Sequence, residues 1–175
     1  STLDRSSAAS DVYKRQVVDV GCINLRAVVV FGVKVSQECL EQFQSLKLGR
    51  KTKYIIYTLS PDNTEIVVSK TSDSSNYDDF LAELPPAECR YAIYDFEFQK
   101  GDEGKRNKIC FFTWSPDESK VKQKMLYASS KEALRKALVG IATEIQGTDL
   151  SEVSYEAVLE KVMRSSFKIY KISIG

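Results

Sequence analysis

The sequence predicts a single α/β domain in which a central mixed β-sheet is flanked by α-helices. Two observations support this. The chain has 175 residues, 43% of them hydrophobic, which suits one domain with a sizeable core. Between residues 36 and 164, segments with helical spacing of apolar residues alternate with short segments rich in β-branched and aromatic residues. Their order (helix, two strands, helix, two strands, then helices) indicates a mixed sheet covered by helices.

The first predicted elements are a helix and a hairpin. Apolar residues recur at helical spacing over Ser36–Leu48, whose first residue is a typical N-cap and which is followed by Gly49. Lys53–Leu59 and Thr64–Ser69 have the composition of strands. Because Ser60–Asn63 between them has turn-forming residues, the two strands are predicted to form a hairpin.

A second helix and a second strand pair follow. Apolar spacing over residues 77–84 predicts a short helix that ends at Pro85-Pro86. Arg90–Phe98 and Lys108–Trp114 are predicted strands, joined by the charged loop Gln99–Asn107. Their aromatic residues are better explained by core packing than by stacking on RNA bases, because the two segments are strongly apolar throughout.

A long helix is predicted next. Ser115-Pro-Asp-Glu118 has the spacing of a capping box, and no Gly or Pro interrupts the chain before Gly140. Ser129–Glu132 repeats this spacing and predicts a kink or restart. An apolar stripe on the second half should face the sheet, and it consists of Leu134, Leu138 and Ile141.

The long helix carries a charge imbalance that the whole chain does not. The chain has 25 basic and 24 acidic residues, a net charge of +1, yet Glu132 is the single acid among six bases over residues 120–136. In a continuous helix four of these bases lie within about 60° of one another, namely Lys120, Lys124, Lys131 and Arg135. Such a stripe repels itself, which favours a binding surface for an acidic protein, a phosphoinositide or a nucleic acid. A solvated face without a partner is the alternative, and Lys105–Lys108 forms a second basic cluster.

Composition argues against most catalysis. The chain has no His, which removes Ser-His and Cys-His nucleophiles and every His-containing metal site. The cysteines are far apart without a C-x-x-C pair, which argues against zinc and favours reduced core residues; they are Cys22, Cys39, Cys89 and Cys110. We therefore expect no enzymatic activity, no cofactor and no metal, and the near-neutral net charge argues against a nucleic-acid partner.

The two ends differ from the middle of the chain. Residues 1–31 are predicted to be an extension outside the domain and not native to it, because Asp11–Gln16 resembles a translated library adapter. The apolar stretch Val17–Val33 is interrupted by charges and too short to cross a membrane. Residues 165–175 form a separate tail, in which Phe167–Ile174 alternates apolar and polar residues as a strand does.

From Gly32 to Arg164 the sequence resembles the actin-depolymerising factor/cofilin family, and its fungal members in particular. Six segments carry the resemblance: Tyr91–Phe98 (YAIYDFEF), Gly104–Lys108 (GKRNK), Phe112–Asp117 (FTWSPD), Lys124–Lys131 (KMLYASSK), Gln146–Asp149 (QGTD) and Ser151–Tyr155 (SEVSY). The resemblance implies a single ADF-homology domain over residues 32–164.

The same resemblance implies a monomeric, non-enzymatic protein of the cytoplasm and actin cytoskeleton, with nuclear entry as a further expectation. Such a protein binds monomeric and filamentous actin, prefers the ADP form, and severs and depolymerises filaments. The alternative is a filament side-binding protein or phosphoinositide-regulated adaptor of the same fold without severing activity. The phosphorylatable serine of the family has no counterpart here, since Val28–Phe31 precede Gly32, so inhibition by N-terminal phosphorylation is not expected.

The resemblance also assigns residues to three binding surfaces. A surface for monomers and filaments comprises Gly32, Val33, Lys34, Val35, Lys122, Lys124, Met125, Lys131, Glu132, Arg135 and Lys136. A filament-only surface comprises Arg106, Lys108, Glu160, Lys161 and Arg164. Phosphoinositides are expected to compete for Lys122, Lys124, Lys131, Arg135 and Lys136.

Overall fold

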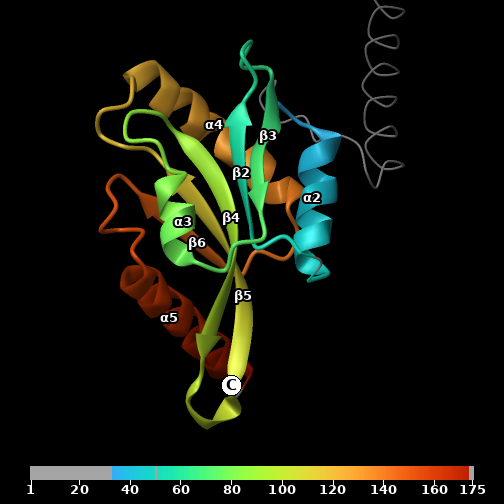
Figure 1. The fold of residues 1–175 in the computed structure, drawn as a ribbon, viewed down its shortest axis with the longest axis vertical. Helices are drawn as coiled ribbons and strands as arrows, with labels where there is room; N and C mark the ends of the chain where they lie inside the picture. Colours follow the sequence, from blue (N-terminus) through green and yellow to red (C-terminus); the bar gives the residue numbers. More distant parts are fainter. Residues whose placement is uncertain (1–32, 50, 174–175) are drawn as a thin grey trace, which may run out of the picture.

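The computed structural model describes residues 33–49 and 51–173. Its helices are α2 (Gln37–Lys47), α3 (Tyr77–Ala82), α4 (Val121–Ala137), α5 (Tyr155–Ser173) and the short 3-10 helix Gly101–Glu103 (Figure 1). Its strands are β1 (Lys34–Val35), β2 (Tyr54–Leu59), β3 (Glu65–Ser72), β4 (Arg90–Gln99), β5 (Lys105–Trp114) and β6 (Thr143–Gly147).

The six strands form one mixed sheet in the order β1-β3-β2-β4-β5-β6. The four central strands pair antiparallel, whereas β1 lies parallel to β3 and β6 parallel to β5. Parallel neighbours need a crossover connection, and here α2 with the following strand and α4 supply the crossovers. The predicted mixed sheet is therefore confirmed.

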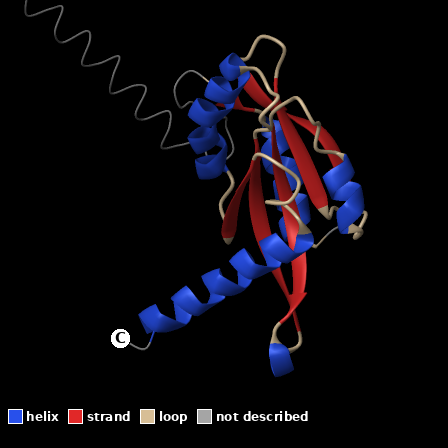
Figure 2. Cartoon of the chain, turned by 90° about the vertical axis from the view of Figure 1, so that its left-hand side faces the viewer, coloured by secondary structure: helices blue, strands red, loops and turns tan. Residues whose placement is uncertain are grey.

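Helices cover both faces of the sheet. One core contains Phe43 of α2 and Leu134 of α4, and the other contains Phe80 of α3 and Val158 of α5. The apolar stripe predicted for the second half of the long helix is buried as expected, because Leu134 and Leu138 are fully buried and Ile141 packs against the same core. Of these residues Leu134 lies within α4, whereas Leu138 is its C-cap and Ile141 follows the helix. Figure 2 shows α5 running along the end of the sheet, with its C-terminal turns extending beyond the strands.

Burial on both faces explains the uninterrupted apolar run over residues 91–94 in strand β4. Tyr91 and Ile93 belong to the core under α2 and α4, while Ala92, Tyr94 and Phe96 belong to the core under α3 and α5. Alternate residues of a strand point to opposite faces, so a strand buried on both sides cannot alternate with polar residues. The expectation that these aromatic residues form core is confirmed.

Three of the four cysteines are also core residues. Cys39, Cys89 and Cys110 are buried and free, as predicted, and Cys22 lies outside the described residues. Burial raises the pKa of the Cys39 thiol to about 11 and that of Cys110 to about 12. Both thiols therefore stay protonated and unreactive near neutral pH.

The start of the long helix was predicted incorrectly. Helix α4 begins at Val121 after an N-cap at Lys120, not at the capping box of Ser115–Glu118. The reason is tertiary: the backbone N–H of Ser115 donates to the carbonyl of Gly147 at 3.0 Å, so this residue still belongs to the sheet edge. The hydroxyl of Ser119 donates to the carbonyl of Pro116 at 2.7 Å and closes a turn ahead of the helix.

The predicted kink and the predicted end of this helix were also wrong. Helix α4 is continuous from Val121 to Ala137, three residues short of Gly140. Ser129 does not restart it, because its hydroxyl donates backward to the carbonyl of Leu126 at 3.0 Å.

Two further segments differ from the sequence prediction. Strand β5 begins at Lys105, because β4 and β5 stay paired down to Gln99 and Lys105. The basic cluster Lys105–Lys108, predicted at the junction of loop and strand, therefore lies entirely on the strand. The tail predicted as a strand over Phe167–Ile174 is helical as far as Ser173. No Gly or Pro stops the helix after Tyr155, and extending an existing helix avoids the cost of nucleation.

Two strands were not anticipated by the sequence analysis. Strand β1 has only two residues, too few for a pattern. Strand β6 does alternate buried and exposed residues, but it is short and ends at a glycine. Both lie at the edges of the sheet.

The close packing around Gly147 leads to a prediction about the stability of its alanine variant. A Cβ atom at this position would overlap the Cγ1 methyl of Val153 and would lie 3.5 and 3.6 Å from ring atoms of Trp114. Because both neighbours are buried core residues, Gly147→Ala should lower the free energy of unfolding by about 1–3 kcal/mol through overpacking. Urea unfolding measures this. Gln146→Ala, at an exposed site on the same strand, should stay within about 0.5 kcal/mol of wild type, and equal stabilities of the two variants would contradict the packing argument.

Candidate functional site

Helix α4 exposes an apolar pair near its start. Val121 and Met125 lie one turn apart and keep 73% and 67% of their surface accessible. Large apolar side chains on a helix surface mark a contact site when charged groups surround them. The resemblance placed a contact at Met125 and none at Val121, whose exposure beside Met125 makes it a further candidate. The spacing of four residues between them is visible in the sequence.

Three cations of the predicted stripe lie along this helix, and each has an acidic neighbour. The Lys124 ammonium lies 3.9 Å from the carboxylate Oδ1 of Asp117 and donates to the backbone carbonyl of the same residue at 3.1 Å. The Lys131 ammonium lies 3.2 Å from Oε2 of Glu144, and Nε of Arg135 donates to Oε1 of the same carboxylate. Lys120 precedes the helix as its N-cap. The expected one-sign stripe is therefore partly neutralised from strand β6 rather than from within the helix.

The two neighbouring cations change the pKa of the Glu144 carboxyl. The Arg135 hydrogen bond, followed by the hydrogen bond and charge of Lys131, lowers the pKa of the Glu144 carboxyl below its usual value. The carboxylate is thus charged throughout the neutral range, and it links α4 to β6.

The other charges of α4 are more accessible. Lys122 is exposed on the first turn. Lys136 and Glu132 form an exposed i, i+4 pair at 3.6 Å, with well over half of each side chain accessible. Surface pairs of this kind contribute little to stability and can be exchanged for a partner's charges.

The N-terminal part of the predicted surface lies beside α4. Strand β1 contacts α4, and Lys34 is exposed on it. Val33 and Val35 are buried in the core, so a partner would contact their backbone rather than their side chains. Gly32 lies outside the described residues.

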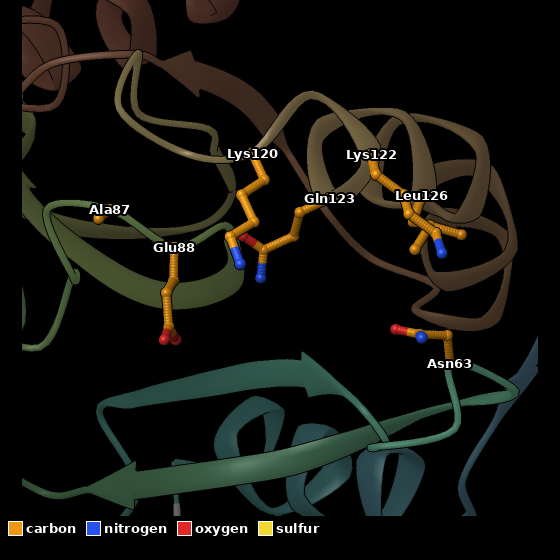
Figure 3. A pocket seen from close by; sticks show the side chains of 7 residues that line it. All are labelled: Asn63, Ala87, Glu88, Lys120, Lys122, Gln123 and Leu126. Atoms are coloured by element: carbon orange, nitrogen blue, oxygen red, sulfur yellow. The ribbon is translucent and has the colours of Figure 1, made fainter.

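A groove of about 480 Å³ opens where α4 begins. It is lined by Asn63, Ala87, Glu88, Lys120, Lys122, Gln123 and Leu126. Figure 3 shows Lys120 and Gln123 extending toward Glu88, with Asn63 of the β2–β3 turn across the opening. Two ammonium groups and one carboxylate therefore surround a hollow next to the exposed apolar pair.

The residues predicted for filaments alone lie on β5 and α5. The β4–β5 hairpin projects to the end of the molecule opposite the start of α4 (Figure 1). The Lys108 ammonium donates to the carbonyl of Val162 and to the hydroxyl of Ser165, both at 3.1 Å, which joins β5 to α5. Burial lowers the pKa of the Lys108 ammonium. Arg106 is exposed and its guanidinium lies 2.8 Å from the carboxylate of Glu103. Arg164 is also exposed and its guanidinium lies 2.5 Å from the carboxylate of Glu160.

Within residues 33–49 and 51–173, no cluster of three or more potential metal ligands occurs. In the same part of the chain, no helix combines the length and hydropathy that crossing a membrane would require.

A six-stranded sheet covered on both faces, a helix with an exposed apolar pair among cations, and a second charged surface define a protein-binding domain. Comparison with known proteins identifies its family. The sequence model described as cofilin/tropomyosin-type actin-binding protein matches residues 32–163. The chain belongs to the cofilin/actin-depolymerising factor family.

Individual cofilins align with this chain over most of their own length. The cofilin of Mycosarcoma maydis is 76% identical over 136 residues, which cover 78% of this chain and 98% of that protein. The cofilin of Saccharomyces cerevisiae is 57% identical over 136 residues, covering 77% and 95%. The crystal structure titled Streptomyces griseoflavus cofilin superimposes with a TM-score of 0.73 at 59% identity, covering 76% of this chain and 98% of that one. The resemblance to fungal members noted in the sequence is confirmed.

Proposed function

We propose that this chain binds actin monomers and filaments, prefers ADP-bound actin, and severs and depolymerises filaments. The observation that carries the proposal is the high identity to cofilins over nearly their whole length. The chain acts by binding rather than by catalysis, in keeping with the absence of His from its sequence.

The contact with actin monomers is proposed to centre on α4 and β1. Val121 and Met125 provide apolar area that is removed from water on binding, while Lys122 and the neighbouring cations attract an acidic partner and set its orientation. Strand β1, which carries Lys34, contacts α4, and this supports a contact surface shared by the two elements.

The second contact, with a neighbouring subunit of the filament, is proposed to lie at the β5 and α5 surface. The β4–β5 hairpin extends to the opposite end of the molecule from the start of α4 (Figure 1), so one domain can touch two subunits at once. If a twisted filament fits both contacts better than the relaxed one, binding stabilises the twist. Strain at the boundary between decorated and bare segments then breaks the filament.

Phosphoinositide head groups are proposed as competing ligands of the α4 cations. Lys122, Lys131 and Arg135 are at least partly exposed and lie on one helix, which supports an anionic ligand at the actin-binding surface. We further propose that the functional unit is the monomeric domain of residues 32–164, acting in the cytoplasm and able to enter the nucleus, and that residues 1–31 are dispensable.

Co-sedimentation with actin filaments at increasing protein concentration tests the proposal. We expect the protein to pellet with filaments, the unsedimented actin to increase, and microscopy to show shorter filaments. Pelleting without a change in monomer level or filament length would indicate the alternative, a side-binding protein of the same fold. Repeating the assay with a chain that begins at Gly32 shows whether the extension affects monomer binding.

A further inference from the structure

Glu144 occupies a position on the proposed actin-binding surface that the sequence did not reveal. It lies on β6, and both of its carboxylate oxygens are engaged by side chains of α4. Lys131 and Arg135 are one helical turn apart, so a single carboxylate between them fixes the separation and direction of both cations.

The contact leaves both cations able to bind a partner. Glu144 accepts the Nε–H of Arg135, and the guanidinium has four further N–H donors on its terminal nitrogens. Lys131 contributes its ammonium to the other oxygen, and an ammonium has further N–H donors. Roughly a third of each cationic side chain is still accessible.

The contact is poorly placed to serve stability alone. The Glu144 side chain is 40% exposed, and ion pairs at such sites contribute little to the free energy of unfolding. An arrangement of this kind can instead reduce the side-chain entropy that binding would otherwise cost.

We propose that Glu144 is a positioning residue of the α4 surface, which holds Lys131 and Arg135 in the arrangement that meets acidic groups of actin. The inference rests on the proposed function. It specifies that the helix cations act as a prearranged pair rather than as independent mobile charges.

The variant Glu144→Gln distinguishes positioning of the two cations from a second possibility, in which Glu144 only reduces the positive charge of the surface. The amide has no charge and one acceptor oxygen, so it cannot hold both cations. Loss of positioning should speed dissociation of fluorescent actin monomers about tenfold, while the loss of one negative charge should change the association rate less than about threefold. If Glu144 only weakens the attraction of the surface for an acidic partner, the variant will instead bind more tightly, which overturns the proposal.

Glu41→Gln is the matched control, because Glu41 is exposed on α2 and the substitution changes the net charge equally. It should leave the dissociation rate at the wild-type value. Stopped-flow measurements on the full chain give both rate constants, and thermal unfolding of both variants should match wild type. If Glu144→Gln does not fold, Glu144→Asp, which is too short to reach both cations, should show a smaller increase of the same kind.

A measurement on the free protein separates positioning from general effects on binding. The Nε–H of Arg135 should exchange slowly with water by NMR in wild type and rapidly in Glu144→Gln. Fast exchange in wild type would overturn the proposal. Wild-type chain that does not bind monomers would contradict the proposed function as well, whereas normal wild-type binding with an unaffected Glu144→Gln would contradict this inference alone.

Discussion

Replacing Lys122 and Lys124 together by alanine is expected to abolish binding to actin monomers and filaments alike, with a loss of at least about 100-fold on each. Lys122 is exposed beside the groove at the start of α4. Lys124 follows two residues later, about 160° from Lys122 around the helix, on the same side as Lys131 and Arg135. Both charges flank Met125, so the variant removes the cations that surround the exposed apolar side chain. Titration of fluorescent monomers and co-sedimentation with filaments measure the two affinities.

The two lysines differ in their internal contacts, which the controls must separate. The Lys124 ammonium donates to the carbonyl of Asp117 and helps to hold the turn before α4. Lys122→Ala alone should therefore weaken binding without changing the unfolding temperature. Lys70→Ala, at an exposed lysine on β3 that pairs with Glu83, should leave binding unchanged. Affinities of the double variant within about twofold of wild type would rule out α4 as the shared contact.

Replacing Arg106 and Lys108 by alanine is expected to spare monomer binding and to weaken filament binding about tenfold or more. Both residues lie on β5 near the β4–β5 hairpin, which projects away from the start of α4 (Figure 1). Their replacement should therefore not change the affinity for a monomer that binds at α4. The same monomer titration and co-sedimentation assays apply. An equal loss on monomers and filaments would contradict the assignment of two separate surfaces.

The structure shows that this double variant combines two effects. The Lys108 ammonium donates hydrogen bonds to the carbonyl of Val162 and the hydroxyl of Ser165. Lys108→Ala removes these contacts between β5 and α5 and should lower the unfolding temperature. Arg106 is exposed and pairs with Glu103, so Arg106→Ala should weaken filament binding at unchanged stability. Lys105→Ala, at the neighbouring exposed lysine paired with Glu97, is the matched control for charge on the same strand. If Arg106→Ala leaves filament binding unchanged, the weaker filament binding of the double variant is caused by the loss of the Lys108 contacts with α5.

Much of the fold could be predicted because its signals are local. The helix over Gln37–Lys47 follows from apolar spacing and from Ser36, whose hydroxyl accepts the N–H of Cys39 as an N-cap should. The strands β2 and β4 follow from runs of aromatic and β-branched residues that are buried on both faces of the sheet. Each signal lies within one element and needs no knowledge of what packs against it.

Two errors occurred where the pattern within a segment did not decide its structure. Ser115-Pro-Asp-Glu118 has every local feature of a helix start, yet Gly147 holds its first backbone N–H in the sheet. The terminal segment alternates like a strand, yet it continues α5. Periodicity cannot detect either case. The first depends on a hydrogen bond to a residue far away in the sequence, and the second on a helix that has already formed upstream.

The sequence by itself determined the fold class, the family resemblance and the basic, partly apolar character of α4. These depend on residue types and on spacings within a single element. Only the tertiary structure decided that Glu144 of β6 pairs with two of the α4 cations and that Lys108 joins β5 to α5 across 54 residues. The physical reason is that the strength and direction of a surface charge depend on its neighbours in space, and the chain folds those neighbours together from separate elements.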